Sequence, residues 1–204
     1  MIKQFKILKF INFKISDPSN PSRYEVPFKS LQYEDSCPGD APCTNPFLNV
    51  DVGSDYLSVS NKNNELLFDT KNVGHGFLYT NQFLQIVMNL GYTNLYGFGE
   101  NTHHSFKHSF SYSNWWGIFG RDQGTGGKYI NLYGSQPFFM AVNEKTGRAF
   151  GVLILNSNAQ EYGLLPPNSI SYRTIGGILD FYIVSCISNV ILPTFKAFYL
   201  VCFL

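Results

Sequence analysis

Short apolar runs, each ended by a cluster of turn-forming residues, recur along most of this 204-residue chain. Typical clusters are Asp17-Pro-Ser-Asn-Pro21 and Asn61-Lys-Asn-Asn64, whose side chains and proline rings favour reversal of the backbone. Nowhere does a long i, i+3, i+4, i+7 apolar pattern stand between helix-capping residues, so amphipathic helices are not expected to form the core. Strand signals at this spacing are typical of an all-β sandwich.

The runs expected to form strands either alternate apolar and polar residues or are short and wholly apolar. Phe83–Leu90 fits a helix or a strand by periodicity, and its end at Gly91 favours a strand. A hairpin is expected where Phe138–Val142 and Arg148–Leu155 flank the five-residue turn Asn143-Glu-Lys-Thr-Gly147. The remaining expected strands are Ile7–Ile15, Phe47–Val52, Tyr56–Ser60, Glu65–Asp69, Ser169–Arg173 and Gly177–Val184.

The composition agrees with a folded, turn-rich domain and excludes several other classes. Charged residues make up 14% of the chain, compared with roughly 25% in an average domain, and aromatic residues make up 17%. Lys and Arg number 15 against 14 Asp and Glu, without a basic stripe, so nucleic acid is not an expected partner. The length suffices for one domain whose core needs neither a metal nor a disulfide.

Four cysteines, Cys37, Cys43, Cys186 and Cys202, form neither a CxxC pair nor a metal-ligand spacing with histidine. Cys37 and Cys43 bracket a short Pro-Gly-Asp-Ala-Pro loop. These two thiols form a small-loop disulfide if the protein is outside the cytosol, or both stay free, and the sequence leaves the two alternatives open. Neither a metal nor an organic cofactor is expected.

The two ends of the chain carry no clear targeting signal. Lysines at positions 3, 6, 9 and 14 interrupt the apolar residues of the N-terminus, so it lacks the continuous apolar region of a signal peptide. Residues 185–204 are mostly apolar, with Pro193 and Lys196 inside them, and barely reach the roughly 20 residues of a membrane span. We therefore expect a domain over residues 1–184 and a separate apolar tail over 185–204; a membrane anchor is the alternative.

A polar and aromatic segment between positions 96 and 133 is the strongest candidate for a binding site. Trp115 and Trp116 precede Arg121-Asp122 and a glycine-rich loop. Aromatic rings stack on the apolar faces of sugars, and Arg and Asp bind hydroxyls in fixed directions, so this arrangement suits a carbohydrate. The spacing alone favours a simpler interpretation, in which both tryptophans are core residues and Arg121 and Asp122 form a salt bridge in a turn.

Glu100, His103 and His104 supply the residue types of an acid–base set, since histidine titrates near neutral pH. Histidines clustered in a loop are more often polar surface, so catalysis by this group is not the favoured interpretation. Tyr96-Gly-Phe-Gly99 lacks the spacing and the Lys-Ser/Thr of a phosphate loop. The patterns of serine hydrolases, zinc proteases and EF-hands are also absent from the sequence.

Several strings in this chain stand in an order and spacing that one known family shares. They are Tyr96-Gly-Phe-Gly-Glu100, Trp116-Gly-Ile-Phe-Gly-Arg-Asp-Gln123, Asn131-Leu-Tyr-Gly134, Pro137-Phe-Phe-Met140, Gly151-Val-Leu-Ile-Leu-Asn-Ser-Asn-Ala159 and Ser171-Tyr-Arg-Thr-Ile-Gly-Gly-Ile-Leu-Asp-Phe-Tyr182. Together they resemble the N-terminal domain of glycoside hydrolase family 31 α-glucosidases, in particular the group of maltase-glucoamylase, sucrase-isomaltase and lysosomal α-glucosidase. The resemblance covers about residues 10–184.

The resemblance implies a galactose-mutarotase-like β-sandwich, in agreement with the strand pattern. In that family the sandwich precedes a (β/α)8 barrel, which supplies an Asp nucleophile and an Asp acid/base for retaining hydrolysis of terminal α-glucosidic bonds. A loop of the sandwich reaches the barrel mouth, and Arg121 and Asp122 are the matching positions. By resemblance, Asp122 binds glucose hydroxyls and Arg121 lines the neighbouring subsite, with an α-glucoside or maltooligosaccharide as substrate. An extracellular, lysosomal or membrane-associated location is also implied.

The match ends after Tyr182-Ile-Val184, where the family continues toward its barrel. A barrel needs about 250 residues, so we expect this chain to lack the catalytic carboxylates and to be inactive alone. The favoured hypothesis is an N-terminal domain fragment of an α-glucosidase. A stand-alone carbohydrate-binding module and a membrane-tethered structural domain are the alternatives, and a mutarotase activity through His103 and Glu100 is less favoured than either.

Overall fold

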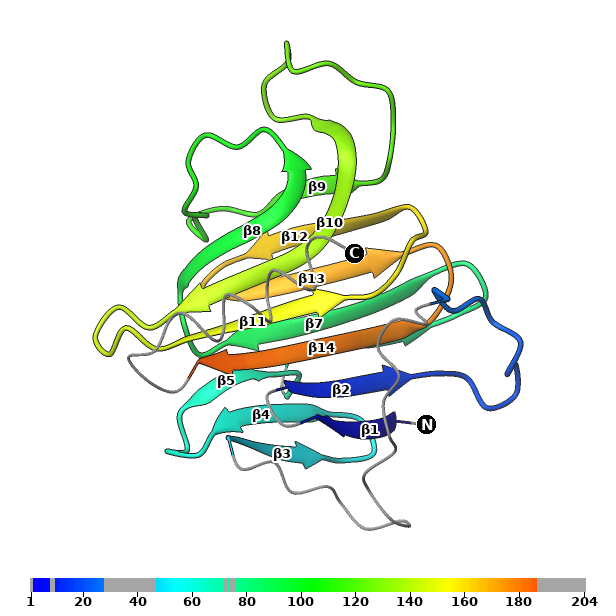
Figure 1. The fold of residues 1–204 in the computed structure, drawn as a ribbon, viewed down its shortest axis with the longest axis vertical. Helices are drawn as coiled ribbons and strands as arrows, with labels where there is room; N and C mark the ends of the chain where they lie inside the picture. Colours follow the sequence, from blue (N-terminus) through cyan, green and yellow to red (C-terminus); the bar gives the residue numbers. More distant parts are fainter. Residues whose placement is uncertain (1, 8–9, 28–46, 72, 74–75, 187–204) are drawn as a thin grey trace.

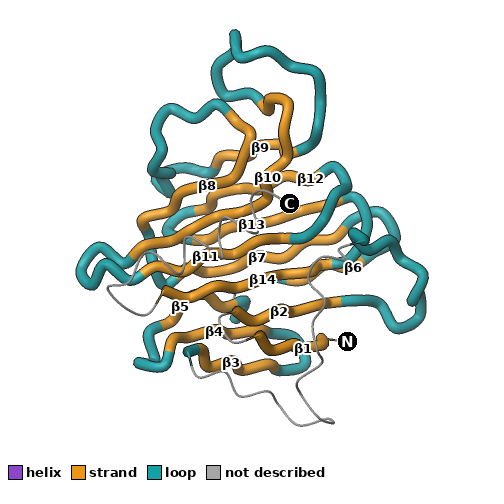
Figure 2. Tube along the Cα trace, in the orientation of Figure 1, coloured by secondary structure: helices purple, strands orange, loops and turns teal. Residues whose placement is uncertain are grey.

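Two antiparallel β-sheets pack face to face and form the molecule (Figures 1 and 2). The computed structural model describes residues 2–7, 10–27, 47–71, 73 and 76–186, and every regular element in these residues is a β-strand. The expected all-β sandwich is therefore confirmed. Within the described part of the chain, no helix is long and apolar enough to cross a bilayer.

One sheet has six strands in the order β1-β2-β14-β11-β10-β8, so the N-terminal hairpin lies beside the last strand. β14 pairs with β2 along most of its length, from Leu179 opposite Ile15 to Val184 opposite Phe10. The bounds are β1 Ile2–Ile7, β2 Phe10–Ile15, β8 Asn94–Asn101, β10 Asn131–Val142, β11 Ala149–Ile154 and β14 Leu179–Cys186.

The other sheet follows the order β3-β4-β5-β7-β13-β12-β9, and β6 pairs with β7 beside β5. β13 is central in this sheet because it pairs with β7 on one side and with β12 on the other. The bounds are β3 Leu48–Val52, β4 Leu57–Asn61, β5 Leu66–Asp69, β6 Phe77–Tyr79, β7 Leu84–Leu90, β9 Asn114–Ile118, β12 Gln160–Leu165 and β13 Ser169–Thr174.

The core fills the space between the two sheets. Alternate residues of each strand point inward, as Leu84, Ile86 and Met88 do in β7, all of which are fully buried. Rings from both sheets meet there: Phe150 of β11 lies 6.4 Å from Phe68 of β5, centre to centre. Each such side chain contributes about 1.5–3 kcal/mol on full burial, so this core supplies most of the stability of the sandwich.

Each expected run contains a strand, but the first run is divided between two strands. The run Ile7–Ile15 was expected as one strand, but β1 and β2 form an antiparallel pair with Ile7 opposite Phe10. An apolar alternation without Gly or Pro does not mark a reversal, which is why this expectation was wrong. The hairpin of β10 and β11 is confirmed; Gly147 in its turn has a φ of +67°, a conformation that glycine adopts without strain.

The last strand of the described residues extends two residues past position 184, the expected end of the domain. Ser185 and Cys186 still belong to β14, where they pair with Phe150 and Ala149 of β11. Residues 187–204 lie outside the described residues, so the tail expected over 185–204 stays a prediction. Cys37 and Cys43 also lie outside the described residues.

Candidate functional site

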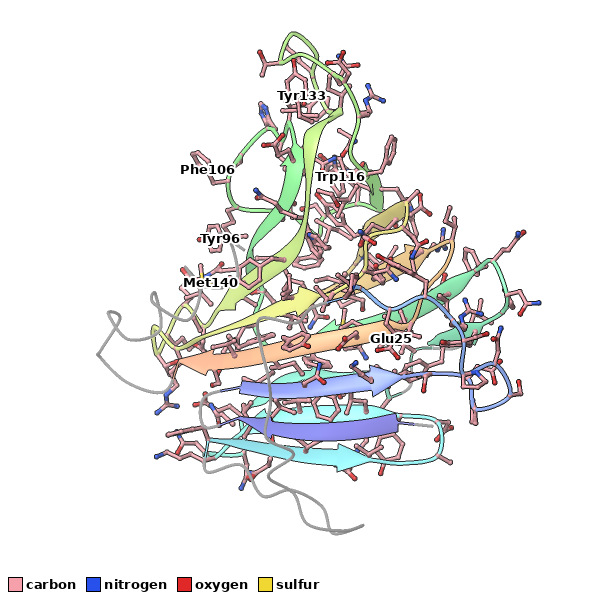
Figure 3. The ribbon with its side chains drawn as sticks, turned by 45° about the vertical axis from the view of Figure 1, so that its right-hand side comes forward. Glu25, Tyr96, Phe106, Trp116, Tyr133 and Met140 are labelled. Carbon is pink, nitrogen blue, oxygen red and sulfur yellow. The ribbon has the colours of Figure 1, made fainter. Side chains whose placement is uncertain are left out.

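Two loops extend past the sheets at one end of the sandwich (Figure 1). Residues 102–113 connect β8 to β9, and residues 119–130 connect β9 to β10. β8 and β9 are the outer strands of their sheets, and both loops leave from this shared edge. Figure 3 places Tyr133 near the tip of this end, while Phe106 points away from the first loop into solvent. We call residues 119–130 the Arg121–Asp122 loop, because it carries both residues that the sequence analysis selected.

Arg121 and Asp122 are both exposed in this loop. The backbone N–H of Arg121 donates to the carbonyl oxygen of Tyr133 at 3.3 Å, and its guanidinium donates to the side-chain oxygen of Gln123. Asp122 forms neither a hydrogen bond nor an ion pair with any described residue. The turn salt bridge of the simpler interpretation is therefore not formed, and the Asp122 carboxylate is open to a ligand.

The base of the Arg121–Asp122 loop is fixed by hydrogen bonds. Asn131, buried at the start of β10, donates from Nδ2 to the carbonyl oxygen of Phe119 at 2.6 Å and accepts from the N–H of Phe119 at 3.4 Å. At the other end, the N–H of Ile130 donates to Oγ1 of Thr102 at 2.9 Å, and the N–H of Thr102 donates to the carbonyl oxygen of Ile130 at 3.0 Å. Both ends of an exposed loop are thus held on the scaffold, which positions its side chains.

The two tryptophans of β9 have different environments. Trp116 points into the molecule and stacks on Tyr162 of β12, with ring centres 5.2 Å apart (Figure 3). Trp115 points to the outer face of the eight-stranded sheet and is 38% exposed. The simpler interpretation, with both rings in the core, therefore holds for Trp116 and is wrong for Trp115. Adjacent residues of a strand point to opposite faces, so only one of the pair can be a core residue.

His103 and His108 pack with Trp116 and Tyr162 between the first loop and the sandwich. The two imidazole centres are 4.5 Å apart, and Nε2 of His103 lies 2.9 Å from the Tyr162 hydroxyl oxygen. Burial lowers the pKa of His103 to about 4, and it also lowers the pKa of His108. Both rings are therefore neutral at pH 7.

The acid–base set suggested by Glu100, His103 and His104 is not assembled. Glu100 accepts a hydrogen bond from the N–H of Gly134 at 2.8 Å and so joins β8 to β10. His104 is exposed, and no hydrogen bond joins any two of the three side chains among the described residues. A base must reach the proton that it removes, so this geometry does not support catalysis by the group.

Sequence reasoning gave no role to Asp180, the most buried of the described carboxyl groups. It accepts a hydrogen bond from Nδ2 of Asn12, and Nζ of Lys14 lies 3.7 Å away. Burial raises the pKa of Asp180 to about 6, in spite of these partners. Asp180 lies within the string Ser171–Tyr182, which was the only signal for it. Its contacts join β14 to β2, so its role is to hold the six-stranded sheet together.

The described residues contain no group of three His, Cys, Asp or Glu side chains that could hold a metal. A shallow depression of about 690 Å³ lies beneath the first loop, with Lys107, Glu144 and three serine hydroxyls in its lining. None of its lining residues belongs to the Arg121–Asp122 loop. The depression and the predicted sugar-binding residues are therefore separate places on the surface.

The sequence of this chain and its two-sheet fold both match one protein family. Its profile, that of the glycosyl hydrolase 31 N-terminal galactose mutarotase-like domain, matches residues 11–162. The chain belongs to this family. The fold and the family that the sequence strings suggested are confirmed. The family match includes the Arg121–Asp122 loop, but it assigns no role to either residue.

Individual relatives agree with this assignment. The chain is 44% identical to the intestinal sucrase-isomaltase of Suncus murinus over 84% of its own length, and 32% identical to the lysosomal α-glucosidase of Mus musculus over 85%. It spans 9% and 17% of the length of these two relatives. A glucose-complexed dextranase of family 31 from Flavobacterium johnsoniae shares the fold, with a TM-score of 0.62 at 18% identity over 88% of this chain and 23% of that one.

Proposed function

We propose that this glycoside hydrolase 31 domain serves an α-glucosidase by presenting the Arg121–Asp122 loop to the substrate. The observation that carries the proposal is the free carboxylate of Asp122, on a loop whose two ends are held by Asn131 and Thr102. A carboxylate accepts hydrogen bonds from two sugar hydroxyls, and the adjacent Arg121 donates to a neighbouring sugar unit. The substrate is an α-glucoside or a maltooligosaccharide, in line with the names of the relatives.

The catalytic carboxylates come, in this proposal, from a (β/α)8 barrel that packs beside the sandwich. Retaining hydrolysis needs two carboxyl groups about 5–5.5 Å apart on either side of the scissile bond, one to attack the anomeric carbon and one to protonate the leaving oxygen. Several half-buried or buried carboxylates of the described residues already have other partners: Glu65 binds Tyr92 and Arg148, Glu161 binds Arg173, and Asp180 binds Asn12. We therefore expect the 204 residues alone not to hydrolyse α-glucosides.

The location follows from the same relatives. One of them is named an intestinal and one a lysosomal enzyme, so we propose that this domain works on the extracellular side or in the lysosome. Cys37 and Cys43 would then meet an oxidising environment, in which a disulfide persists. Mass spectrometry of the non-reduced chain distinguishes the disulfide from two free thiols by a difference of about 2 Da.

A hybrid enzyme tests the proposed role of the loop. The matching segment of a sucrase-isomaltase is replaced by residues 11–184 of this chain, and maltose hydrolysis is measured. In this hybrid, Asp122→Asn should lower kcat/KM at least about tenfold, since a charged hydrogen bond to substrate contributes about 1.5–3 kcal/mol. Lys128→Gln, an exposed change in the same loop, is the matched control and should keep the activity. An Asp122→Asn hybrid as active as the parent would overturn the proposal.

The isolated chain gives a second test. Purified residues 1–204 are incubated with maltose, and released glucose is measured against a buffer blank. We expect no release above the blank. Turnover that persists after further purification would show that the chain holds its own catalytic carboxylates. It would contradict the proposal that a barrel supplies them.

A further inference from the structure

Two histidines attach the loop of residues 102–113 to the sandwich. Most side chains of this loop are exposed, whereas His108 is buried and His103 is half-buried. The backbone N–H of His108 donates to the carbonyl oxygen of Leu95 at 2.9 Å, and its Nε2 lies 2.8 Å from the carbonyl oxygen of Gly97. Both contacts are with β8, so His108 ties the middle of the loop back to the strand from which the loop leaves.

His103 lies among rings from three parts of the fold. Its ring centre is 4.5 Å from that of His108 and 5.1 Å from that of Trp116 of β9. Its Nε2 lies 2.9 Å from the hydroxyl oxygen of Tyr162 of β12. We call these three neighbouring rings the His103 cage. A neutral imidazole fits this surrounding, because only one of its nitrogens needs a partner inside the fold and the rest of the ring packs on other rings.

The charged groups around the cage offer little compensation for a positive charge inside it. Within the described residues, neither imidazole forms an ion pair or a hydrogen bond with a carboxylate. Glu100 of β8 is bonded to the backbone of β10 instead. Lys107 and Glu144 line the depression that His108 also borders, and their charges are opposite. Tyr162 keeps its proton, because burial raises its pKa.

Thr102 joins the His103 cage to the Arg121–Asp122 loop. It comes directly before His103 in the chain, and its Oγ1 accepts a hydrogen bond from the N–H of Ile130 at 2.9 Å. Its own N–H donates to the carbonyl oxygen of Ile130 at 3.0 Å. Ile130 is the last residue of the Arg121–Asp122 loop. Because adjacent residues share a peptide unit, His103 cannot leave its cage without moving the backbone that holds Ile130.

We propose that His103 is a positioning residue for the Arg121–Asp122 loop, acting through Thr102, and that acid loosens its hold. Inside the cage, His103 fixes Thr102, and Thr102 fixes the end of the loop at Ile130. A protonated imidazole is solvated better in water than among rings, so acid favours an opened first loop in which His103 reaches water. The loop that presents Asp122 then loses one of its two attachments. The consequence for the substrate rests on the proposed function above.

The pKa of His103 gives the direction and the size of this effect. Burial lowers it from 6.5 to about 4, so between these pH values an exposed His103 binds a proton that the caged ring does not. Full solvation of the ring would favour the opened loop about fiftyfold more at pH 4.5 than at pH 7. Because the caged ring already reaches solvent in part, we expect a shift of about tenfold.

Amide hydrogen exchange of the full 204-residue chain tests the proposal. Mass spectrometry compares pH 7 with pH 4.5, and each rate is corrected for the intrinsic dependence of exchange on pH. We expect exchange to rise about tenfold in acid in both segments, residues 102–113 and residues 119–130. Both segments should stay less protected than β13 at either pH, because they open locally while the sandwich remains folded.

Two variants test whether His103 is the titrating group. His103→Gln cannot take up the proton, and exchange in the two segments should then differ by less than about twofold between the two pH values. His104→Gln, at the exposed neighbouring residue, is the matched control and should show the acid response of the parent. Circular dichroism at both pH values shows whether each variant is folded.

Two further variants test the connection through Thr102, and they decide the coupling even where His103→Gln does not fold. Thr102→Val has nearly the same shape but lacks the hydroxyl that accepts from Ile130. Residues 102–113 should keep their acid response in this variant, while residues 119–130 exchange fast at both pH values and no longer follow it. Thr102→Ser keeps the hydroxyl and should behave as the parent does.

Three results would overturn the proposal. In the first, acid speeds exchange in residues 102–113 of the parent but not in residues 119–130. In the second, His103→Gln shows the full acid response, which would assign it to other groups. In the third, both segments are as protected as β13, so that His103 supports only the fold as a whole. Failure of the proposed function looks different: the Asp122→Asn hybrid stays as active as its parent, while both segments of the chain still respond to acid together.

Discussion

The hydroxyl oxygen of Tyr162 lies 2.9 Å from Nε2 of His103, and this hydrogen bond joins strand β12 to the loop that follows β8. The Tyr162 ring lies between Phe98, stacked at 3.9 Å, and Trp116, stacked at 5.2 Å, centre to centre. One side chain therefore connects both sheets and the first of the two loops that extend past them. The loop is held by a polar contact inside an otherwise aromatic cluster.

Tyr162→Phe should remove this hydrogen bond and leave the stacked rings in place. We expect the free energy of unfolding to fall by about 1 kcal/mol, the usual contribution of a hydrogen bond with one partner left unpaired. Urea unfolding followed by fluorescence measures the change. Tyr129→Phe removes a hydroxyl from a side chain that is 59% exposed and should change the value by less than about 0.5 kcal/mol. Equal effects of the two variants would show that the Tyr162–His103 contact does not stabilise the fold.

His103 should make the protein less stable in mild acid. Because burial lowers its pKa from 6.5 to about 4, the unfolded chain takes up a proton below pH 6.5 that the folded chain does not. The free energy of unfolding therefore decreases as the pH falls from 6.5 to 4. We expect about 1 kcal/mol between pH 7 and pH 5, a value reduced because the ring partly reaches solvent.

His103→Gln should remove that part of the pH dependence. The measurement compares urea unfolding of parent and variant at pH 7 and pH 5, so that other titrating groups cancel in the difference. His104→Gln, an exposed change at the next residue, is the control and should follow the parent. A parent and a His103→Gln variant with the same pH dependence would contradict the neutral, buried state of His103.

Asp180 should act in the opposite direction. Burial raises its pKa from 3.8 to about 6, so between these pH values the folded chain keeps a proton that the unfolded chain has lost. The contribution of this group to stability is complete below pH 4 and decreases as the pH rises through 6. Asp180→Asn is uncharged at every pH and can still accept the hydrogen bond from Asn12.

Relative to Asp180→Asn, the parent should lose about 2 kcal/mol of stability between pH 4 and pH 7. Urea unfolding of both proteins at the two pH values gives the difference. Asp55→Asn, at an exposed turn, should track the parent. The parent could instead gain stability relative to Asp180→Asn as the pH rises. That result would show that the ion pair with Lys14 stabilises the Asp180 carboxylate more than burial destabilises it.

The strands that the sequence predicts have mostly apolar inward residues. β7 and β13 have Leu, Ile, Met or Tyr at every buried inward position apart from Thr174, so their period is visible without the fold. β12 was missed because Gly163 and the two prolines after it resemble a turn, whereas that glycine is required by the ring of Trp115. β8 was missed for a similar reason: Gly97 and Gly99 lie inside a strand at the edge of its sheet.

The candidate site is predicted in part. The resemblance selected Arg121 and Asp122, and the structure shows that both are exposed on one loop, while their role in binding stays a prediction. The residues that hold the loop, Asn131 and Thr102, carry no local signal because their hydrogen bonds join positions that the fold brings together. The pairing of Trp115 with Arg173 joins two strands that are not neighbours in the sheet, so no spacing in the sequence indicates it.

Gly97 of β8 should not tolerate a side chain. Its φ is +109°, in the region that L-residues avoid, and an added Cβ would lie 2.6 Å from the carbonyl oxygen of Phe138 in the paired strand β10. Gly97→Ala therefore has to strain its own backbone and push the two strands apart. We expect a loss of about 2 kcal/mol or more in the free energy of unfolding.

Gly126 in the Arg121–Asp122 loop is the matched control for this substitution. A Cβ added there meets no atom within 4 Å, so Gly126→Ala should change the stability by less than about 0.5 kcal/mol. Thermal and urea unfolding of both variants at one pH measure the contrast. Similar stabilities for the two alanine variants would mean that β8 and β10 can move apart at Gly97 without a loss of stability. The pairing of these two strands would then not hold the loops as rigidly as it indicates.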